Sequence, residues 1–327
     1  MLMLQSPILF IDQLTFGPDG RLYAAGATRL TNQTRDSRGI GVWSIPGSAD
    51  PILHLLADQF VTGFCVNPAG RWLYLAAKEK RDDEQKHYRA LDLSKNAIHS
   101  LGLAASGWDD DFQLAVLPDG GSFIASGLAS RRGPNVVARW KQPPNSVPTR
   151  EWLKTVTSGT EPSTILAIDS QGTRIVTLNV RLDDERGPYK LVTHDPSDWS
   201  NMSRNRVSDK IAIWDQLLFH PFDSCLLLRS RNAFFVWDAK DLSLEPKRIA
   251  SGRRELTCIA FHPSGRFLAA TSNDETVKIF ETNTWKLTKT YAWNIGRLRS
   301  IAFSPDGALA AAGSDTGKIV VWDVDDF

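Results

Sequence analysis

Two stretches near the C-terminus decide the fold: Ile259-Ala260-Phe261-His262-Pro263-Ser264-Gly265 and Ile301-Ala302-Phe303-Ser304-Pro305-Asp306-Gly307. They begin 42 residues apart, at positions 259 and 301. Each is a short apolar run followed by a Pro-x-Gly turn, in which proline presets φ and glycine accepts a positive φ. A phrase repeated at this spacing predicts a repeated supersecondary unit.

The same phrase recurs upstream, and we count seven copies. Leu14-Thr15-Phe16-Gly17-Pro18-Asp19-Gly20 is a close copy. The fourth copy lacks the proline, and the fifth has Asp223 in place of glycine. The turns of the seven copies end at residues 20, 70, 120, 172, 223, 265 and 307.

Each copy continues with the same succession of segments. A second apolar run follows the turn, and a polar loop follows that run. A β-branched and aromatic run comes next, such as Phe234-Phe235-Val236-Trp237-Asp238, and a weaker strand such as 286–291 closes the unit. Four short strands per unit, with turn signals between them, predict a four-stranded antiparallel sheet.

The last copy, 301–323, resembles a WD repeat of the β-propeller class, since it carries the Phe-Ser-Pro-Asp-Gly turn and ends in Trp322-Asp323. Of the seven equivalent dipeptides only Trp237-Asp238 and Trp322-Asp323 are true Trp-Asp. The family's Gly-His before the first strand is missing, and Thr316 stands where the family usually has Asp, whereas Asp274 keeps that place. The resemblance therefore implies an incomplete His–Ser–Asp–Trp network, as in the degenerate repeats of bacterial members.

This pattern predicts an all-β fold: a seven-bladed β-propeller of four-stranded antiparallel blades, in one domain over residues 1–327. The last copy stops after its third strand, while the N-terminus has a spare apolar segment, Met1 to Gln5. We expect this segment to supply the missing strand and close the ring, which protects the sheet edges. The alternative is a disordered tail.

Composition bounds the function. The chain has 327 residues, with 38 Lys and Arg against 37 Asp and Glu. A net charge of +1 argues against general binding to nucleic acid or anionic membranes. Three cysteines exclude a disulfide framework, and no apolar run approaches the ~18 residues of a membrane span. The N-terminus lacks the features of a signal peptide, so we expect a cytoplasmic protein and a monomer.

The sequence contains no recognisable catalytic motif, and we predict neither cofactor nor metal. His220 and His262 precede the turn prolines and are interpreted as turn residues, and Cys65, Cys225 and Cys258 as inert core residues. The positions at the start of the innermost strands are occupied by Asp12, Thr62, Thr164, Asp215, Thr257 and Arg299. Such a set makes a poor metal cage, and its simpler interpretation is a solvated channel rim. An enzyme, a hydrolase or lyase with a polar site at the channel mouth, stays open as the alternative.

Loop length is the most informative irregularity. The second and third strands are joined tightly in copies five to seven, but by charged loops in copies one to four. These loops predict a charged crescent on one rim, unless they are merely solvated insertions. Loops on a rigid scaffold often carry function, so we predict a non-catalytic scaffold that binds a peptide or protein partner there. The candidate partner-binding residues are Arg35, Arg38, Trp108, Arg131, Arg132, Arg181 and Arg186.

Two further alternatives concern the tryptophans between the copies and the arginines of the charged loops. Trp108 and Trp293 lie in connections between copies, where each could be an exposed interface anchor or could pack between blades. RNA binding through the Arg-rich loops is the other alternative, and it would require a steep salt dependence.

Overall fold

The structure is a computed structural model, and every regular element that it describes is a β-strand. Among the described residues there is no helix of the length and hydrophobicity that a membrane span requires. The described residues are 1–31, 34–37, 39–47, 49–56, 60–78, 85–106, 113–128, 135–143, 146–155, 164–179, 190–206, 216–222 and 224–324.

The chain divides into two compact units. Unit one comprises Met1–Val61, Arg229–Phe235 and Arg248–Phe327, and unit two comprises Thr62–Leu228 and Val236–Lys247. The prediction of one domain over 1–327 stays a prediction.

Unit one contains blades one, six and seven. Blade one consists of β2 (Phe10–Phe16), β3 (Leu22–Thr31), β5 (Ile40–Trp43) and β6 (Leu53–Leu55), with β4 (Thr34–Ser37) paired to β3. Blade six consists of β23 (Leu256–Phe261), β24 (Phe267–Ser272), β25 (Thr276–Glu281) and β26 (Lys286–Ala292). Blade seven consists of β27 (Leu298–Phe303), β28 (Leu309–Ser314), β29 (Lys318–Asp323) and β1 (Leu2–Gln5).

Unit two contains most of blades two to five. Blade two consists of β7 (Phe60–Val66), β8 (Trp72–Lys78), β9 (Gln85–Asp92) and β10 (Ala97–Ser106). Blade three consists of β11 (Gln113–Val116), β12 (Ser122–Leu128), β13 (Asn135–Lys141) and β14 (Thr149–Thr155). Blade four consists of β15 (Thr164–Ile168), β16 (Ile175–Asn179), β17 (Lys190–His194) and β18 (Asn201–Arg206). Blade five consists of β19 (Gln216–Phe219), β20 (Cys225–Ser230), β21 (Ala233–Asp238) and β22 (Lys247–Ala250).

These seven antiparallel sheets make the fold a seven-bladed β-propeller, which confirms the predicted fold class. The turn between the first two strands of each blade follows from the repeated phrase. Six of the seven turns end in a glycine with φ between 65° and 77°, and the seventh, at Asp223, lies outside the described residues. The positive φ explains why glycine recurs at this position.

The turns also hold neighbouring blades together. His262 Nε2 lies 2.9 Å from the carbonyl oxygen of Gly307, while its Nδ1 accepts the N–H of Ser264 at 3.1 Å. A Cβ at Gly307 would lie only 2.5 Å from that ring, so the close approach itself requires glycine. In blade five, His220 Nδ1 accepts the N–H of Phe222 at 3.1 Å. Both histidines are thus turn residues, as predicted.

The tryptophans of the third strands lie in the core. Trp43, Trp140, Trp237 and Trp322 are each at most 5% exposed, which confirms their predicted place. In blade seven, the ring of Trp322 packs against Trp293 at 4.7 Å and Tyr291 at 5.8 Å between centroids. The packing alternative therefore holds for Trp293. Trp322 Nε1 has no hydrogen-bond partner among the described residues, so the family's polar network is incomplete in this blade, as expected.

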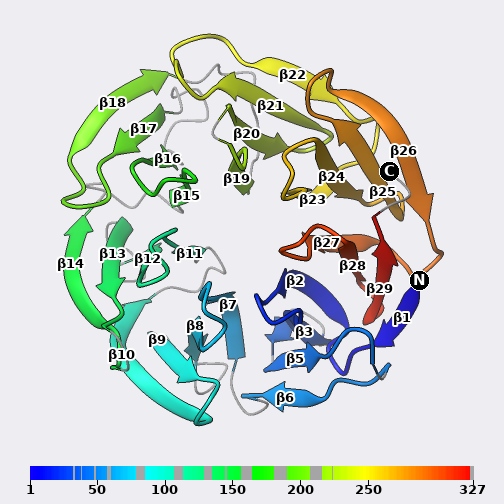
Figure 1. Ribbon diagram of the computed structural model, residues 1–327, viewed down its shortest axis with the longest axis horizontal. Helices are drawn as coiled ribbons and strands as arrows, with labels where there is room; N and C mark the ends of the chain where they lie inside the picture. The colour runs from blue at the N-terminus through cyan, green and yellow to red at the C-terminus, as the bar shows by residue number, and fades with distance from the viewer. Residues whose placement is uncertain are drawn as a thin grey trace. The chain divides into compact units, whose positions relative to one another are not determined.

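The N-terminal segment completes blade seven. β1 pairs antiparallel with β29 from Leu2↔Val321 to Gln5↔Lys318, and Figure 1 shows the two strands side by side. Leu4 and Ile8 are fully buried, and Ser6 donates its N–H to the carbonyl oxygen of Gly317 at 2.8 Å. The predicted latch is confirmed over Leu2–Gln5, and the alternative of a disordered tail is wrong for this segment.

We predict that deleting residues 1–8 destabilises the protein. The deletion removes the β1 ladder and the burial of Leu4 and Ile8, each of which contributes about 1.5–3 kcal/mol. We expect thermal unfolding followed by circular dichroism to show a melting temperature lowered by about 5–10 °C. The matched control replaces Met1 and Met3 by Gln, because both side chains are exposed. An unchanged melting temperature in the deletion variant would show that β1 does not stabilise blade seven.

We predict that Trp322→Ala costs roughly 3–5 kcal/mol, from lost burial and the cavity left beside Trp293 and Tyr291. Denaturant unfolding measures this loss. Tyr291→Phe is the control, because it keeps the aromatic packing. A variant that retained full stability but lost only partner binding would contradict the core assignment.

Candidate functional site

The innermost strands of unit one share a bulge at one position. Asp12 in β2, Thr257 in β23 and Arg299 in β27 are each skipped in the pairing with the second strand. A bulge leaves its extra residue unpaired and can redirect that residue's side chain. The three residues that the sequence places at equivalent positions are therefore all bulge residues.

Each bulge is matched by a hydrogen bond from the preceding blade to the carbonyl just before it. Ser300 Oγ donates to Ile11 O at 2.6 Å, Thr257 Oγ1 to Leu298 O at 2.7 Å, and Arg229 Nη1 to Leu256 O at 2.5 Å. A buried carbonyl without a partner is costly, so these donors satisfy the backbone where the ladder is interrupted. The same bonds join blade five to six, six to seven and seven to one within unit one.

Backbone segments approach each other closely at the bulge of blade one. A Cβ on Gly26 of β3 would lie 1.7 Å from the carbonyl oxygen of Phe10, and one on Gly313 of β28 would lie 2.4 Å from Ile11 Cγ2. Both positions therefore need glycine, one within blade one and one between blades seven and one. This packing places Asp12 beside Arg299.

Arg299 Nε donates to Asp12 Oδ1, and the guanidinium carbon lies 5.7 Å from the centre of the Phe10 ring. The two side chains are partly exposed, Arg299 to 24% and Asp12 to 32%. The sequence places both residues at the same repeat position, but it does not predict that they pair. Opposite charges at equivalent positions in the first and last copies are the signal that could have shown it.

The connections that lead into β23 and β27 carry further arginines. Arg253, Arg254 and Arg297 are exposed, and none forms an ion pair with a residue that the structure describes. Glu255 and Asp315 lie in the same region. Glu255 Oε2 accepts a hydrogen bond from Asn273 Nδ2 at 3.4 Å, and Asp315 Oδ1 accepts one from the N–H of Arg297 at 3.0 Å. These inner-strand ends are therefore rich in charge, with arginine as the cation.

Most of the predicted partner-binding set cannot be placed. Arg35 lies in β4, of which only the backbone is described. Arg38, Trp108, Arg131, Arg132, Arg181 and Arg186 lie outside the described residues, as does Asp215 of the enzyme alternative.

The other described polar groups give little support for metal or thiol chemistry. Among the described residues, no three His, Cys, Asp or Glu side chains gather in a way that could hold a metal ion. Burial raises the pKa of the Cys225 thiol to about 11, and burial also raises the pKa of Cys65. A thiol that stays protonated is a poor nucleophile, which supports the interpretation of these two as inert core residues.

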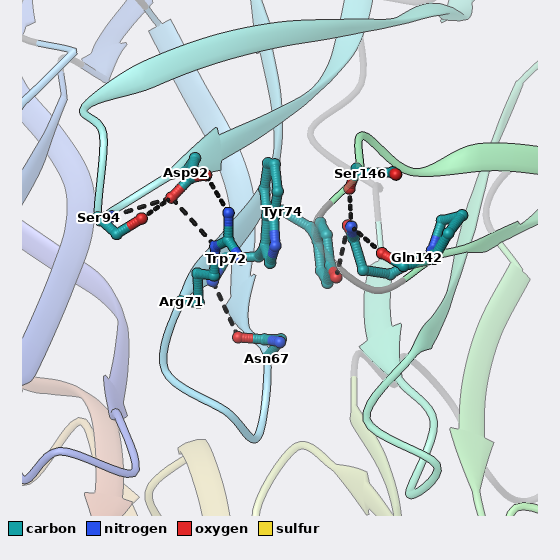
Figure 2. A network of polar contacts seen from close by, with 9 residues as sticks. Asn67, Arg71, Trp72, Tyr74, Asp92, Ser94, Gln142 and Ser146 are labelled. Carbon is teal, nitrogen blue, oxygen red and sulfur yellow. Dashed lines mark hydrogen bonds and ion pairs between the residues drawn. The ribbon is translucent and has the colours of Figure 1, made fainter.

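A second polar cluster lies in blade two, and its role is structural. Figure 2 shows Asp92 between Arg71 and Ser94. Arg71 Nη2 donates to Asp92 Oδ2 at 2.9 Å, and Ser94 donates through its N–H and its hydroxyl. The carboxylate is 1% exposed, and the guanidinium of Arg71 holds the pKa of Asp92 well below its usual range. Both carboxylate oxygens of Asp92 thus accept hydrogen bonds from Arg71 or Ser94. These bonds hold the start of the second strand to the end of the third, which is a structural role.

The rest of this cluster connects blade two to blade three. Asn67 Oδ1 accepts the N–H of Trp72 at 2.9 Å, and Tyr74 OH lies 3.5 Å from Gln142 Oε1 (Figure 2). The Tyr74 ring stacks on Phe123 at 4.1 Å between centroids. These contacts hold β8 of blade two against blade three.

We predict that Asp92→Asn lowers stability at pH 7 by about 1–3 kcal/mol, because it removes a charge-assisted hydrogen bond while keeping the side-chain volume. The pKa of Asp92 is lowered in the folded state, so its contribution is present above the unfolded pKa of about 4. That contribution is lost as the pH falls below this value and through the lower folded pKa. The difference in melting temperature between wild type and variant should therefore be constant near pH 7 and shrink below about pH 4.

Asp238→Asn is the matched control, since Asp238 holds the equivalent place in blade five but is exposed. Its Oδ1 accepts the N–H of Lys240, a bond that asparagine can keep. A difference for Asp92→Asn that persists undiminished to pH 2.5 would contradict the assigned role of the carboxylate.

Comparison with known proteins identifies the repeat. The model of the family described as "WD domain, G-beta repeat" matches residues 245–281 and 285–323. The first match spans β22 to β25 and the second β26 to β29, so each repeat supplies the outer strand of one blade and the three inner strands of the next. This offset explains why blade seven requires β1.

Several relatives match between 22% and 25% of the chain. Serine-threonine kinase receptor-associated protein of Rattus norvegicus is 30% identical over 81 residues, which is 25% of this chain and 23% of the relative. Cross-pathway control WD-repeat protein 2 of Flammulina velutipes is 30% identical over 73 residues, 22% of this chain and 23% of the relative. Small ribosomal subunit protein RACK1 of Neurospora crassa is 27% identical over 73 residues, with the same coverage. The matched segment thus spans under a quarter of these relatives.

Proposed function

We propose that this WD-repeat protein is a non-catalytic interaction scaffold, which binds a peptide or protein partner on the propeller face carrying the charged loops. The observation that carries the proposal is the place of these loops between defined strands. In blades two, three and four the second and third strands are separated by residues 79–84, 129–134 and 180–189. In blade one, β4 extends the corresponding connection.

Blades five to seven differ at the same connection. Their second and third strands are separated by only two or three residues, at 231–232, 273–275 and 315–317. The repeat therefore does not need a long connection here, so the charged segments are additions to the fold. Additions of this kind, on a scaffold held by its own core, are suited to binding.

The relatives support the same class of function. Serine-threonine kinase receptor-associated protein carries an association with another protein in its name. By analogy we assign this chain a protein partner.

The enzyme alternative receives no specific support from the described residues. Asp12, one of its two candidate carboxylates, is bonded to Arg299. This bond engages Oδ1, so that oxygen of Asp12 already has a hydrogen-bond partner. The alternative nevertheless makes a distinct prediction: turnover of a small molecule that survives loop substitutions and fails when Asp12 or Asp215 is changed.

We predict that replacing Arg35, Arg38, Arg131, Arg132, Arg181 and Arg186 together by Ala leaves the fold intact, since loop substitutions usually alter stability by less than about 0.5 kcal/mol each. The variant should capture less of the partner in cross-linked pull-downs from the native cell. Biolayer interferometry with a captured partner should show mainly slower association, with a difference that shrinks at high salt. Trp108→Ala, made separately, tests the apolar centre.

The control replaces Lys95, Lys240 and Arg266 by Ala, because these exposed cations lie in turns at the opposite ends of their blades. If the loop variant still captures every wild-type partner, the loops are only solvated insertions and the binding face is elsewhere. Binding to RNA with a steep salt dependence would favour the nucleic-acid alternative instead.

A further inference from the structure

Arg299 is held in place from two directions. Its Nε donates to the carboxylate of Asp12, and its guanidinium lies over the ring of Phe10. The backbone on both sides is fixed as well, because Ser300 Oγ donates to Ile11 O at 2.6 Å, between the residues next to Arg299 and Asp12. The guanidinium therefore loses little conformational freedom when it binds a ligand. Such preorganisation lowers the entropic cost of binding and raises the affinity.

The Nη1 and Nη2 groups of this guanidinium have no hydrogen-bond partner in the part of the chain that the structure describes. A guanidinium has five N–H donors in a planar fork, and toward the described residues Arg299 uses Nε–H alone. Neither Nη1 nor Nη2 forms a hydrogen bond with any residue that the structure describes, and the side chain is partly exposed. With respect to the described residues, four N–H donors thus stay available to a ligand, and their paired geometry matches a carboxylate.

The join between blades seven and one does not by itself explain this arrangement. The buried Ser300–Ile11 hydrogen bond and the packing of Ile11 on Gly313 already link the two blades. A partly exposed ion pair adds only about 0–1 kcal/mol. At the equivalent position of blade six, Thr257 performs the linking with a neutral hydroxyl. The repeat therefore does not require an arginine at position 299.

The neighbouring cations favour an acidic ligand. β23 and β27 belong to adjacent blades that Thr257 joins, and Arg254 and Arg297 lie just before these strands. Both arginines are exposed and form no ion pair with a described residue. Exposed cations beside a fixed one raise the local concentration of anionic segments and accelerate their association.

We propose that Arg299 is the anchor for an aspartate or glutamate side chain of the protein partner, with Nη1 and Nη2 each donating to one carboxylate oxygen. Asp12 and Phe10 act as positioning residues, and Arg254 and Arg297 attract the acidic segment. This inference rests on the proposed scaffold function and adds the chemistry of the partner to it.

The test uses the full chain and a phage-display library of random twelve-residue peptides. Peptides selected on the wild-type protein should be enriched in Asp and Glu. The best peptide, labelled with fluorescein, is then titrated in fluorescence anisotropy against wild type, Arg299→Gln, Arg299→Lys and Asp12→Asn. We expect Arg299→Gln to weaken binding about 10- to 100-fold, as the loss of a charged hydrogen-bonded pair does.

The other variants separate binding from folding. Arg299→Lys keeps the charge and can still pair with Asp12 but lacks the fork, so it should keep the melting temperature and lose most of the affinity. Asp12→Asn keeps the fork with a weaker hold and should lose less. Arg266→Gln is the matched control, because Arg266 is an exposed arginine whose guanidinium lies 5.5 Å from the centre of the Phe267 ring at the other end of blade six. It should bind like wild type.

Several results would overturn the inference: no acidic enrichment among the selected peptides, equal affinity of wild type and Arg299→Lys, or equal losses for Arg299→Gln and Arg266→Gln. Tighter binding of a single-stranded RNA of equal charge would assign the cations to nucleic acid. A partner lost in the loop variant but kept in Arg299→Gln would leave the scaffold function standing and reject only this anchor. A partner kept in both variants would reject both the charged loops and Arg299 as its binding site.

Discussion

The pairing of β1 with β29 is the interaction on which unit one depends. Each WD repeat begins with the outer strand of the preceding blade, so the last repeat leaves blade seven one strand short. β1 fills that edge and buries Leu4, and the chain then runs directly into β2. The start and the end of the chain thereby become neighbours. The contact between Asp12 and Arg299, 287 residues apart, is a consequence of this closure.

The bulge at the start of the innermost strands is the second organising feature. It interrupts the ladder at one residue, and a side chain of the preceding blade then satisfies the carbonyl before it. Serine, threonine and arginine each do this in one blade, through Ser300, Thr257 and Arg229. A donor of the right reach is required, whereas the residue type is free. In blade six the skipped residue Thr257 is itself such a donor, whereas in blade seven Ser300 takes this role and the skipped residue Arg299 does not.

The two polar clusters illustrate how structure and function divide among the blades. In blade two, Asp92 is buried and accepts hydrogen bonds from Arg71 and Ser94, so its contacts stabilise the fold. At the inner end of β27, Arg299 is held by one nitrogen and keeps the others free of described partners. Both sites contain an Arg–Asp pair. Burial and the number of unused donors, rather than the pairing itself, distinguish a structural contact from a candidate anchor.

The sequence alone determined the architecture, because turn chemistry and strand patterning are local. Proline and glycine at fixed positions in Ser304-Pro305-Asp306-Gly307 impose the turn, and the apolar runs on either side impose the strands. The missing fourth strand and the apolar Met1 to Gln5 segment together predicted the latch. The sequence also placed Asp12, Thr257 and Arg299 at one repeat position and His262 in its turn. Each of these conclusions depends on the order and spacing of residues within a copy.

The tertiary structure decided what happens between copies. Spacing could not show that Asp12 bonds Arg299, that Ser300 reaches Ile11, or that Trp293 packs on Trp322, because these contacts depend on how blades approach each other. Backbone approach there is governed by the absence of a Cβ at Gly26 and Gly313. The pairing of Arg71 with Asp92 likewise needs the register of β8 against β9. Side-chain partnership follows from three-dimensional proximity, which a repeat pattern constrains within one blade but leaves open between neighbouring blades.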